Sequence, residues 1–256
     1  MTPHGPNSYR RWCTEAIESG VPGSLENGLL SRLSPNLSAT VTQRLTPVTL
    51  GRKQTLFEMH EPIAAVYFPV TAVCSLISVM RNGKKAEIAT VGREGMIGGT
   101  SLFGARALPF RAICQIPGEA LMMPSGEFTE LTREHGELRM YLERYMRAHF
   151  VQVAQSSACN SVHDVTRRTA RWLLLTRDRA GSDDFEMTQD LLAEMLGVRR
   201  ATVTEAASDL QRRGLISYRR GRIHIADPRG LEAASCECYG VIRQGYEAID
   251  DDGWAK

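Results

Sequence analysis

The sequence predicts an α+β protein in which an antiparallel β domain comes first, a long helix follows, and a small helical domain with a β hairpin comes last. Three observations predict this order. Short runs rich in β-branched and aromatic residues, separated by turn signals, fill residues 41–123. Helical periodicity replaces that pattern from Ser125 onward. Two short helical segments flank Gly197, and two short β runs follow Gly214.

The length of 256 residues leaves room for two domains, and 43% hydrophobic with 23% charged residues is an ordinary globular composition. We expect a β domain over residues 24–134, a long helix over residues 135–160 and a helical domain over residues 161–256. Residues 1–23 are rich in Pro, Gly, Ser and Asn, which indicates a loose lead-in with one short helix.

One stretch, residues 62–80, carries no charge and could nearly span a bilayer. Its two prolines and its Val, Ile, Tyr and Phe content favour two buried strands broken near Pro69. The amino terminus has no charged start followed by an apolar run and a cleavage site, so we expect no secretory signal. We therefore predict a cytoplasmic protein without a membrane segment.

The β domain is predicted from seven short runs that alternate with turns. Asn82-Gly83 lies between two apolar runs and is a strong hairpin signal. Many short strands with regular turns favour a closed or rolled antiparallel sheet. The runs are VTLGR, TLFEM, AAVYFPV, AVCSLISVM, AEIATV, FRAICQI and ALMMP.

Helical segments follow Pro124. Ser125 is a plausible N-cap of a first helix, and a longer helix should run from about Gly136 to Cys159. That helix carries a stripe at coiled-coil spacing, which we expect to form a dimer interface; the alternative is packing against the chain's own β domain. The stripe residues are Leu138, Leu142, Tyr145, His149 and Gln152. A third helix is expected from Asp164 to Arg177.

Residues 188–216 have the pattern of two helices joined by a tight turn. Thr188 can cap the first helix, and Gly197 permits the left-handed backbone of the turn. The second helix should turn four small or apolar residues inward, namely Val203, Ala206, Ala207 and Leu210. This predicts a helix-turn-helix, whose second helix can enter the DNA major groove, rather than an ordinary helical hairpin.

A basic-tipped β hairpin after Gly214 supports that interpretation. Residues 197–224 hold seven arginines and two acidic residues, while residues 226–256 hold seven acidic residues and three bases. Concentrated positive charge suits a polyanion, although a solvated basic face is the alternative. The residues expected to contact DNA are Thr188, Arg199, Arg200, Thr202, Thr204, Glu205, Arg219, Arg220 and Arg222.

Metal and enzyme motifs are weak in this sequence. The six cysteines form no CxxC pair, and in a helix Cys236 and Cys238 would point to opposite sides. We therefore expect no metal site. The histidines form no HExxH pattern, and no P-loop or GxSxG is present, so we do not expect an enzyme.

With these segments in view, the sequence resembles the Crp/Fnr family of bacterial transcription regulators. The strongest matches are AEMLGVRRATVTEAASDLQRRGLI, DVTRRTARWLLL and GMIGGTSLF. The resemblance implies a cupin-like β-roll sensor domain, a dimerisation helix and a winged helix-turn-helix. It implies a homodimer that binds palindromic double-stranded DNA, with RNA polymerase as a further partner. In the family the residue matching Arg200 usually contacts a base.

The sensor domain departs from the cyclic-nucleotide pattern that the resemblance implies. Gly99 stands where a glutamate would bind ribose, and Pro109-Phe110 stand near the expected Arg-Ser pair. Buried ribose and phosphate need polar partners, so we expect an effector other than cyclic AMP and assign no cofactor. The expected effector-pocket residues are Gly98, Gly99, Thr100, Ser101, Arg106 and Arg111.

Two points stay open in the sequence. Residues 231–249 suggest one more helix that extends the DNA-binding domain, with no assigned function. The rival functional hypothesis is a constitutive DNA-binding protein. In that case the β domain would be a ligand-binding or protein-interaction module without allosteric switching.

Overall fold

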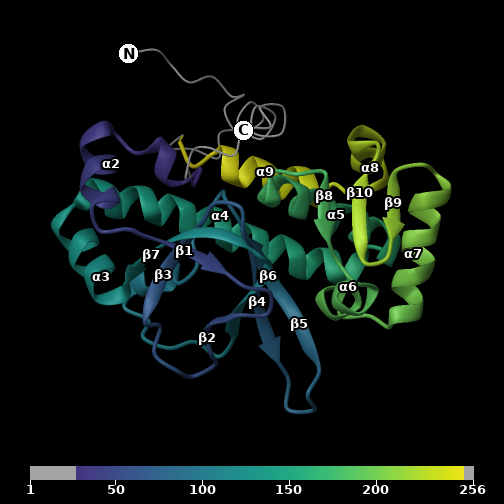
Figure 1. Cartoon of the computed structure of the whole chain (residues 1–256), viewed down its shortest axis with the longest axis horizontal. Helices are drawn as coiled ribbons and strands as arrows, with labels where there is room; N and C mark the ends of the chain where they lie inside the picture. The colour runs from purple at the N-terminus through teal and green to yellow at the C-terminus, as the bar shows by residue number, and fades with distance from the viewer. Residues whose placement is uncertain (1–26, 251–256) are drawn as a thin grey trace.

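The computed structural model describes residues 27–250, and Figure 1 shows a β domain, a long central helix and a smaller C-terminal domain in that order. The predicted lead-in over residues 1–23 and the Cys13 thiol lie outside the described residues. A short 3-10 helix, Leu30–Arg32, is followed by helix α2, Pro35–Thr42. The sequence analysis did not predict α2. Proline at its first position is compatible with a helix because that position needs no N–H donor.

The β domain consists of two antiparallel sheets, as the alternating runs predicted. One sheet has the order β1-β7-β3 and the other the order β2-β6-β4-β5. Each of the seven predicted runs contains one strand. The strands are β1 Thr46–Leu50, β2 Thr55–Phe57, β3 Ala65–Pro69, β4 Val73–Val79, β5 Lys85–Val91, β6 Arg111–Ile116 and β7 Gly118–Pro124.

The Asn82-Gly83 turn joins β4 to β5 as predicted, and Gly83 takes a φ of 79° that favours glycine. The uncharged stretch contains all of β3 and β4, which are separated by a short turn after Pro69. None of the helices within residues 27–250 combines the length and apolarity that a membrane span requires. A second 3-10 helix, Gly99–Phe103, follows the left-handed Gly98.

Two helices leave the β domain. Helix α3, Ser125–Glu134, has Pro124 as its N-cap residue, so the prediction that Ser125 caps it was wrong by one position. Helix α4, Gly136–Val162, runs along the β domain and reaches the C-terminal domain (Figure 1). It extends three residues beyond the predicted end at Cys159.

The C-terminal domain is built on helix α5, Val165–Ala180, whose N-cap Asp164 accepts a hydrogen bond from the backbone N–H of Arg167. Two further helices are α6, Gln189–Leu196, and α7, Arg200–Arg212. A three-stranded sheet of order β8-β10-β9 completes it, with β8 Asp184–Glu186, β9 Ile216–Arg219 and β10 Arg222–Ile225. The sequence predicted β9 and β10 but not β8.

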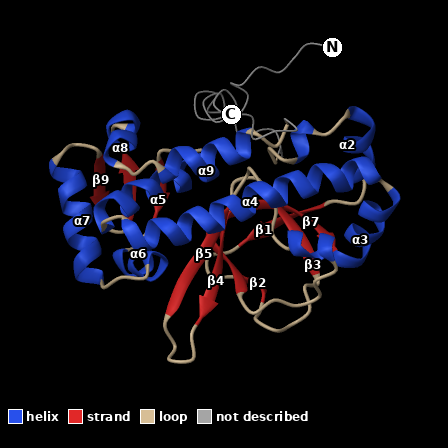
Figure 2. Ribbon diagram, turned by 180° about the vertical axis from the view of Figure 1, so that it is seen from behind, coloured by secondary structure: helices blue, strands red, loops and turns tan. Residues whose placement is uncertain are grey.

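The C-terminal segment differs from its prediction in two ways. It forms two helices, α8 Pro228–Ala234 and α9 Cys238–Glu247, with a break from Ser235 to Glu237. Helix α9 then lies beside α4 instead of extending the C-terminal domain (Figure 2). The prediction of a single helix was wrong because the two parts of the segment pack against different helices. Leu231 of α8 packs near α5, whereas Tyr246 of α9 packs against Tyr145 of α4.

Candidate functional site

Helices α6 and α7 form the predicted two-helix unit. The side chain of Thr188 accepts a hydrogen bond from the N–H of Leu191, and Gly197 ends α6 at a φ of 66°. All four residues predicted to point inward from α7 are buried, at 0–3% exposure. The helix-turn-helix pattern is therefore confirmed at the level of backbone and core.

The outward face of α7 is open to solvent at its first turns. Arg199, Arg200 and Glu205 are exposed, and Nη1 of Arg200 lies 3.4 Å from Oδ1 of Asp190 on α6. Thr202 and Thr204 are half-buried. The Thr204 hydroxyl lies 2.9 Å from Oε1 of Gln189 and 3.0 Å from the carbonyl of Arg200. Of the predicted contact residues on α7, the arginines and Glu205 are thus the more accessible.

The β9–β10 hairpin presents its basic tip beside α7. Arg219, Arg220 and Arg222 are exposed, and Arg220 takes a positive φ of 50° next to Gly221. The Tyr218 hydroxyl donates to the carbonyl of Met187 at 2.7 Å, which anchors the hairpin near the start of α6. Two exposed basic elements therefore share one end of the molecule.

The predicted dimer stripe of α4 lies inside the protomer, which corrects its assignment as an interface. Leu138, Leu142, Tyr145 and Gln152 are 1–2% exposed in the single chain. His149 lies 3.4 Å from the hydroxyl of Tyr246, as Nδ1 to Oη. The sequence could not reveal this because α9 and the β domain, both distant along the chain, cover the stripe.

A buried polar cluster joins the β domain, α4, α5 and α9 at that stripe. Arg179 of α5 donates from Nε to Oε1 of Glu94 and from Nη2 to Oε1 of Gln152, each at 2.8 Å. Tyr246 of α9 donates to the same Gln152 oxygen at 2.6 Å. Burial and the nearby Arg179 charge lower the pKa of His149 to about 4, so its ring is neutral at pH 7. We call Glu94, Gln152, Arg179 and Tyr246 the interdomain hub.

The opposite face of α4 is exposed and was not predicted. Its largest apolar side chain, Phe150, is 71% exposed. Four small residues on the next turns are also exposed, namely Ala154, Ser157, Ala158 and Ser161. This face also has a spacing of three and four residues, at positions 147, 150, 154, 157 and 161. That spacing is typical of a helix-pairing surface, and the sequence analysis assigned this role to the buried stripe instead.

A cavity of about 580 Å³ lies between the β domain and α4. Gly98, Gly99 and Thr100 line it, as predicted, whereas Ser101, Arg106 and Arg111 do not. Arg111 instead lies 3.6 Å from Glu58, as Nη1 to Oε2. Most of the wall is apolar or aromatic, and the lining includes Phe57, Leu76, Ile88, Leu108, Phe110, Met146, Phe150 and Val153.

Charged groups in the cavity wall come only from α4 within residues 27–250, as Glu143 and Arg147. The Thr100 hydroxyl is buried and has no hydrogen-bond partner in the described part of the chain. A side chain at position 99 would meet α4, because a Cβ there would lie 2.6 Å from Sδ of Met146. The cavity is therefore shaped for a largely apolar molecule with few polar groups.

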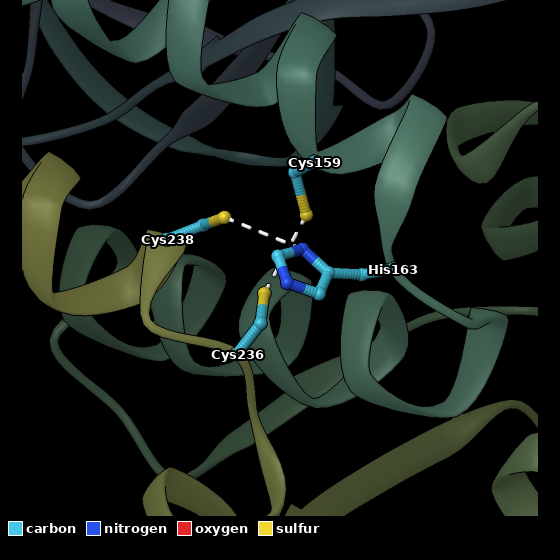
Figure 3. A group of neighbouring side chains, drawn as sticks. All are labelled: Cys159, His163, Cys236 and Cys238. Carbon is cyan, nitrogen blue, oxygen red and sulfur yellow. Dashed lines mark hydrogen bonds between the residues drawn. The ribbon is translucent and has the colours of Figure 1, made fainter.

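Four potential metal ligands gather at the far end of α4, against the prediction of no metal site. Cys159 lies in the last turn of α4 and His163 directly after that helix, while Cys236 and Cys238 lie at the α8–α9 junction (Figure 3). The prediction that Cys236 and Cys238 point to opposite sides assumed that both lie in one continuous helix. The break between α8 and α9 invalidates that assumption, because Cys236 lies between the two helices and only Cys238 belongs to α9.

Comparisons with known proteins give two family models and several relatives. Residues 47–135 match the cyclic nucleotide-binding domain, and residues 167–234 match the Crp-like helix-turn-helix domain. The "CRP-like cAMP-activated global transcriptional regulator" of Mycobacterium tuberculosis is 24% identical over 80% of this chain and 94% of its own length. The "Global nitrogen regulator" of Nostoc sp. is 24% identical over 70% and 85%.

Solved structures show the same fold at lower identity. FixK2 from Bradyrhizobium japonicum has a TM-score of 0.62 at 17% identity, covering 75% of this chain and 98% of its own. The c-di-GMP responsive regulator CLP of Xanthomonas campestris has a TM-score of 0.61 at 13% identity, covering 75% and 99%. The two family models together span more than half of the chain, and the relatives are regulators, in agreement with the expectation that this is no enzyme.

Proposed function

The chain belongs to the Crp/Fnr family of transcriptional regulators, and from this premise we propose that it is a cytoplasmic homodimer that binds a palindromic promoter site under the control of an apolar effector. The observation that carries the DNA-binding part is the exposed face of α7 beside the basic hairpin. Arginine can bind guanine bidentately in the major groove, and Glu205 can accept from cytosine. Two-fold symmetry then predicts half-sites about 34 Å apart.

We propose that Arg200 and Glu205 contact bases and that Arg199, Thr188 and the hairpin arginines contact phosphates. Arg200 lies at the solvent-facing start of α7, where it forms an exposed ion pair with Asp190. Exposed ion pairs contribute about 0–1 kcal/mol, so the guanidinium can leave Asp190 for a base. Thr202 and Thr204 serve as supporting contacts because their side chains are half-buried.

Pairing of two chains is proposed through the exposed face of α4. The large side chains of Arg147 and Phe150 would contact the partner near the middle of α4. The small side chains of Ala154, Ser157 and Ser161 would let the two helices approach closely in the C-terminal half of α4. This face replaces the inward stripe as the dimer surface. RNA polymerase remains the further partner that a promoter-bound regulator would contact.

The effector is proposed to be an apolar small molecule other than cyclic AMP. A cyclic nucleotide would bring a ribose and a charged phosphate into a wall whose β-domain side offers no charged group among the described residues. Burial of such groups without partners costs several kcal/mol, on the order of 2–7 for an uncharged polar group alone. The Mycobacterium tuberculosis relative is named as cAMP-activated, so the two proteins would differ in effector.

Selection of bound fragments from random DNA by the purified chain tests the main proposal. We expect a palindrome to be enriched, and Arg200→Ala to relax preference at one base in each half-site. Enrichment of no sequence at low salt would contradict the proposal. The rival of constitutive binding is favoured if a library of apolar compounds leaves both promoter affinity and thermal stability unchanged.

A further inference from the structure

The end of α4 carries a group of side chains that the DNA-binding function does not use. Cys159 lies in the last turn of α4, and His163 is the C-cap residue whose backbone N–H donates to the carbonyl of Cys159. Cys236 and Cys238 approach from the α8–α9 junction, 73 to 79 residues further along the chain. We call these four residues the Cys3His cluster.

From this cluster we propose a site for one zinc ion, held by three thiolates and one imidazole: Cys159, Cys236, Cys238 and His163. Zinc prefers four ligands in a tetrahedron, and thiolate with imidazole is a common ligand set for structural sites. All four ligand atoms lie within 4.8 Å of one another, so a single ion can reach them all.

Two of the six separations between ligand atoms are close to those of a tetrahedron around one ion, and the rest lie within 4.8 Å. Bond lengths of about 2.3 Å to sulfur and about 2.0–2.1 Å to nitrogen place two sulfurs roughly 3.8 Å apart and a sulfur and a nitrogen roughly 3.6 Å apart. Sγ of Cys159 lies 3.5 Å from Sγ of Cys236, and Sγ of Cys238 lies 3.5 Å from Nδ1 of His163 (Figure 3). Small shifts of these side chains would complete the geometry.

The surroundings of the cluster also fit a bound cation. Nε2 of His163, the ring nitrogen that does not contact Cys238, lies 3.3 Å from Oε1 of Glu237. Metal-binding histidines usually donate their second N–H to a carboxylate in this way, which fixes the tautomer and orients the ring. Nε2 of Gln155 donates to Sγ of Cys238 at 3.1 Å. Both contacts support ligand atoms that already point toward one site.

Charge balance favours three thiolates here. Three thiolates and one divalent ion leave a net charge of −1 at the site. Arg168 and Arg171, which are 8% and 5% exposed, interact electrostatically with Cys159. The three cysteines are themselves 0–4% exposed, so they need charged partners to be deprotonated inside the protein. The ion and the two arginines supply that charge.

Two other uses of the cluster fit less well. An iron–sulfur cluster distributes its protein ligands over several irons, which separates the ligand atoms more widely than one ion does. A Cys159–Cys236 disulfide would account for two of the four residues and would leave the aligned His163 and Cys238 unexplained. A single ion uses all four.

The position of the site suggests its structural consequence. His163 is the C-cap residue of α4, and Asp164 is the N-cap residue of α5. The cluster therefore lies at the connection between α4, which lines the cavity, and the C-terminal domain. The ion would link this connection to the α8–α9 junction. With four protein ligands the coordination is closed, which is typical of a structural site and leaves no position for catalysis. The inference does not depend on the proposed DNA-binding function.

Metal analysis of the full-length chain, purified under reducing conditions without chelators, tests the proposal directly. We expect about one zinc per chain by plasma mass spectrometry. Reconstitution with cobalt(II) should give the visible bands of a tetrahedral thiolate complex. Absence of metal, stoichiometric iron, or a Cys159–Cys236 disulfide in peptide mapping would each overturn it.

Variants assign the metal to these residues. Cys236→Ala should lose the zinc, while Cys74→Ala, another fully buried thiol but in the β domain, should keep it. If Cys236→Ala does not fold, Glu237→Gln decides, because Glu237 is 70% exposed and not a ligand. It should weaken zinc affinity by about 10–100-fold. Equal zinc content in wild type and Cys236→Ala, or an unchanged affinity in Glu237→Gln, would refute the assignment.

Discussion

The DNA-facing surface and the sensor cavity differ in how closely each follows the family pattern. In the helix-turn-helix, Arg200 is exposed at the expected position, and the inward residues of α7 are all buried. In the cavity, Gly99 and an apolar wall replace the polar groups of a cyclic-nucleotide site. Under the proposed function, the DNA-binding surface follows the family pattern, whereas the effector cavity departs from it.

The interdomain hub links the two regions, and its loss should give the largest effect. Glu94→Ala removes the carboxylate that Nε of Arg179 binds, with both side chains 2–4% exposed. Breaking a buried ion pair costs about 3–5 kcal/mol. Urea unfolding should therefore show a loss of that size. Arg212→Ala, which breaks an exposed pair with Asp209, is the control and should cost about 1 kcal/mol or less. Equal losses would show that the hub does not join the regions.

Protonation of His149 should lower the free energy of unfolding at acidic pH. Its pKa is about 4 in the folded chain and about 6.5 unfolded, so its contribution is complete above pH 6.5 and lost as the pH falls toward 4. The difference between these two pKa values corresponds to about 3 kcal/mol in the free energy of unfolding. Burial raises the pKa of Asp178 to about 6, which has the opposite sign over a similar range. Urea unfolding of wild type and His149→Gln from pH 7.5 to 4.5 gives the difference in their free energies of unfolding, which isolates the contribution of His149. A difference that does not change with pH would contradict the prediction.

The DNA-facing region should separate into base and phosphate contacts. Arg200→Ala should cost about 1–3 kcal/mol at the cognate site and relax preference at one base pair. Arg220→Ala should weaken binding to all sequences and lower the slope of log K against log salt by about 1. Gel shifts on cognate and scrambled DNA at several salt concentrations measure both. If both variants lose the same affinity on both DNAs, the two roles are not distinct.

The sensor region should give the smallest effect with cyclic AMP. Since the β-domain side of the cavity wall offers no charged partner for a phosphate within the described residues, we expect no change in melting temperature or promoter affinity at millimolar cyclic AMP. Apolar compounds that fill the cavity should raise the melting temperature. Stabilisation by cyclic AMP would show instead that Arg147 or a second copy of the chain supplies the missing contacts.

Much of the fold could be predicted because its signals are local. The seven β runs, the Asn82-Gly83 turn, the Asp164 cap and the Thr188–Gly197 unit each depend on residues close together in sequence. Strand β8 was missed because its three residues are too short for a periodic signal. The facing of α4 was misjudged because both of its sides carry an acceptable spacing, and only contacts with α9 and the β domain distinguish them.

The sequence by itself determined the helix-turn-helix, the basic hairpin and the order of the domains, since capping, turns and amphipathic spacing act within a few residues. The tertiary structure decided which face of α4 is buried, which residues line the cavity, and that two thiols join Cys159 and His163. Those outcomes depend on contacts between distant segments, such as that of His149 with Tyr246, 97 residues further along the chain. No local preference encodes them, because burial is settled only when the distant segments pack together.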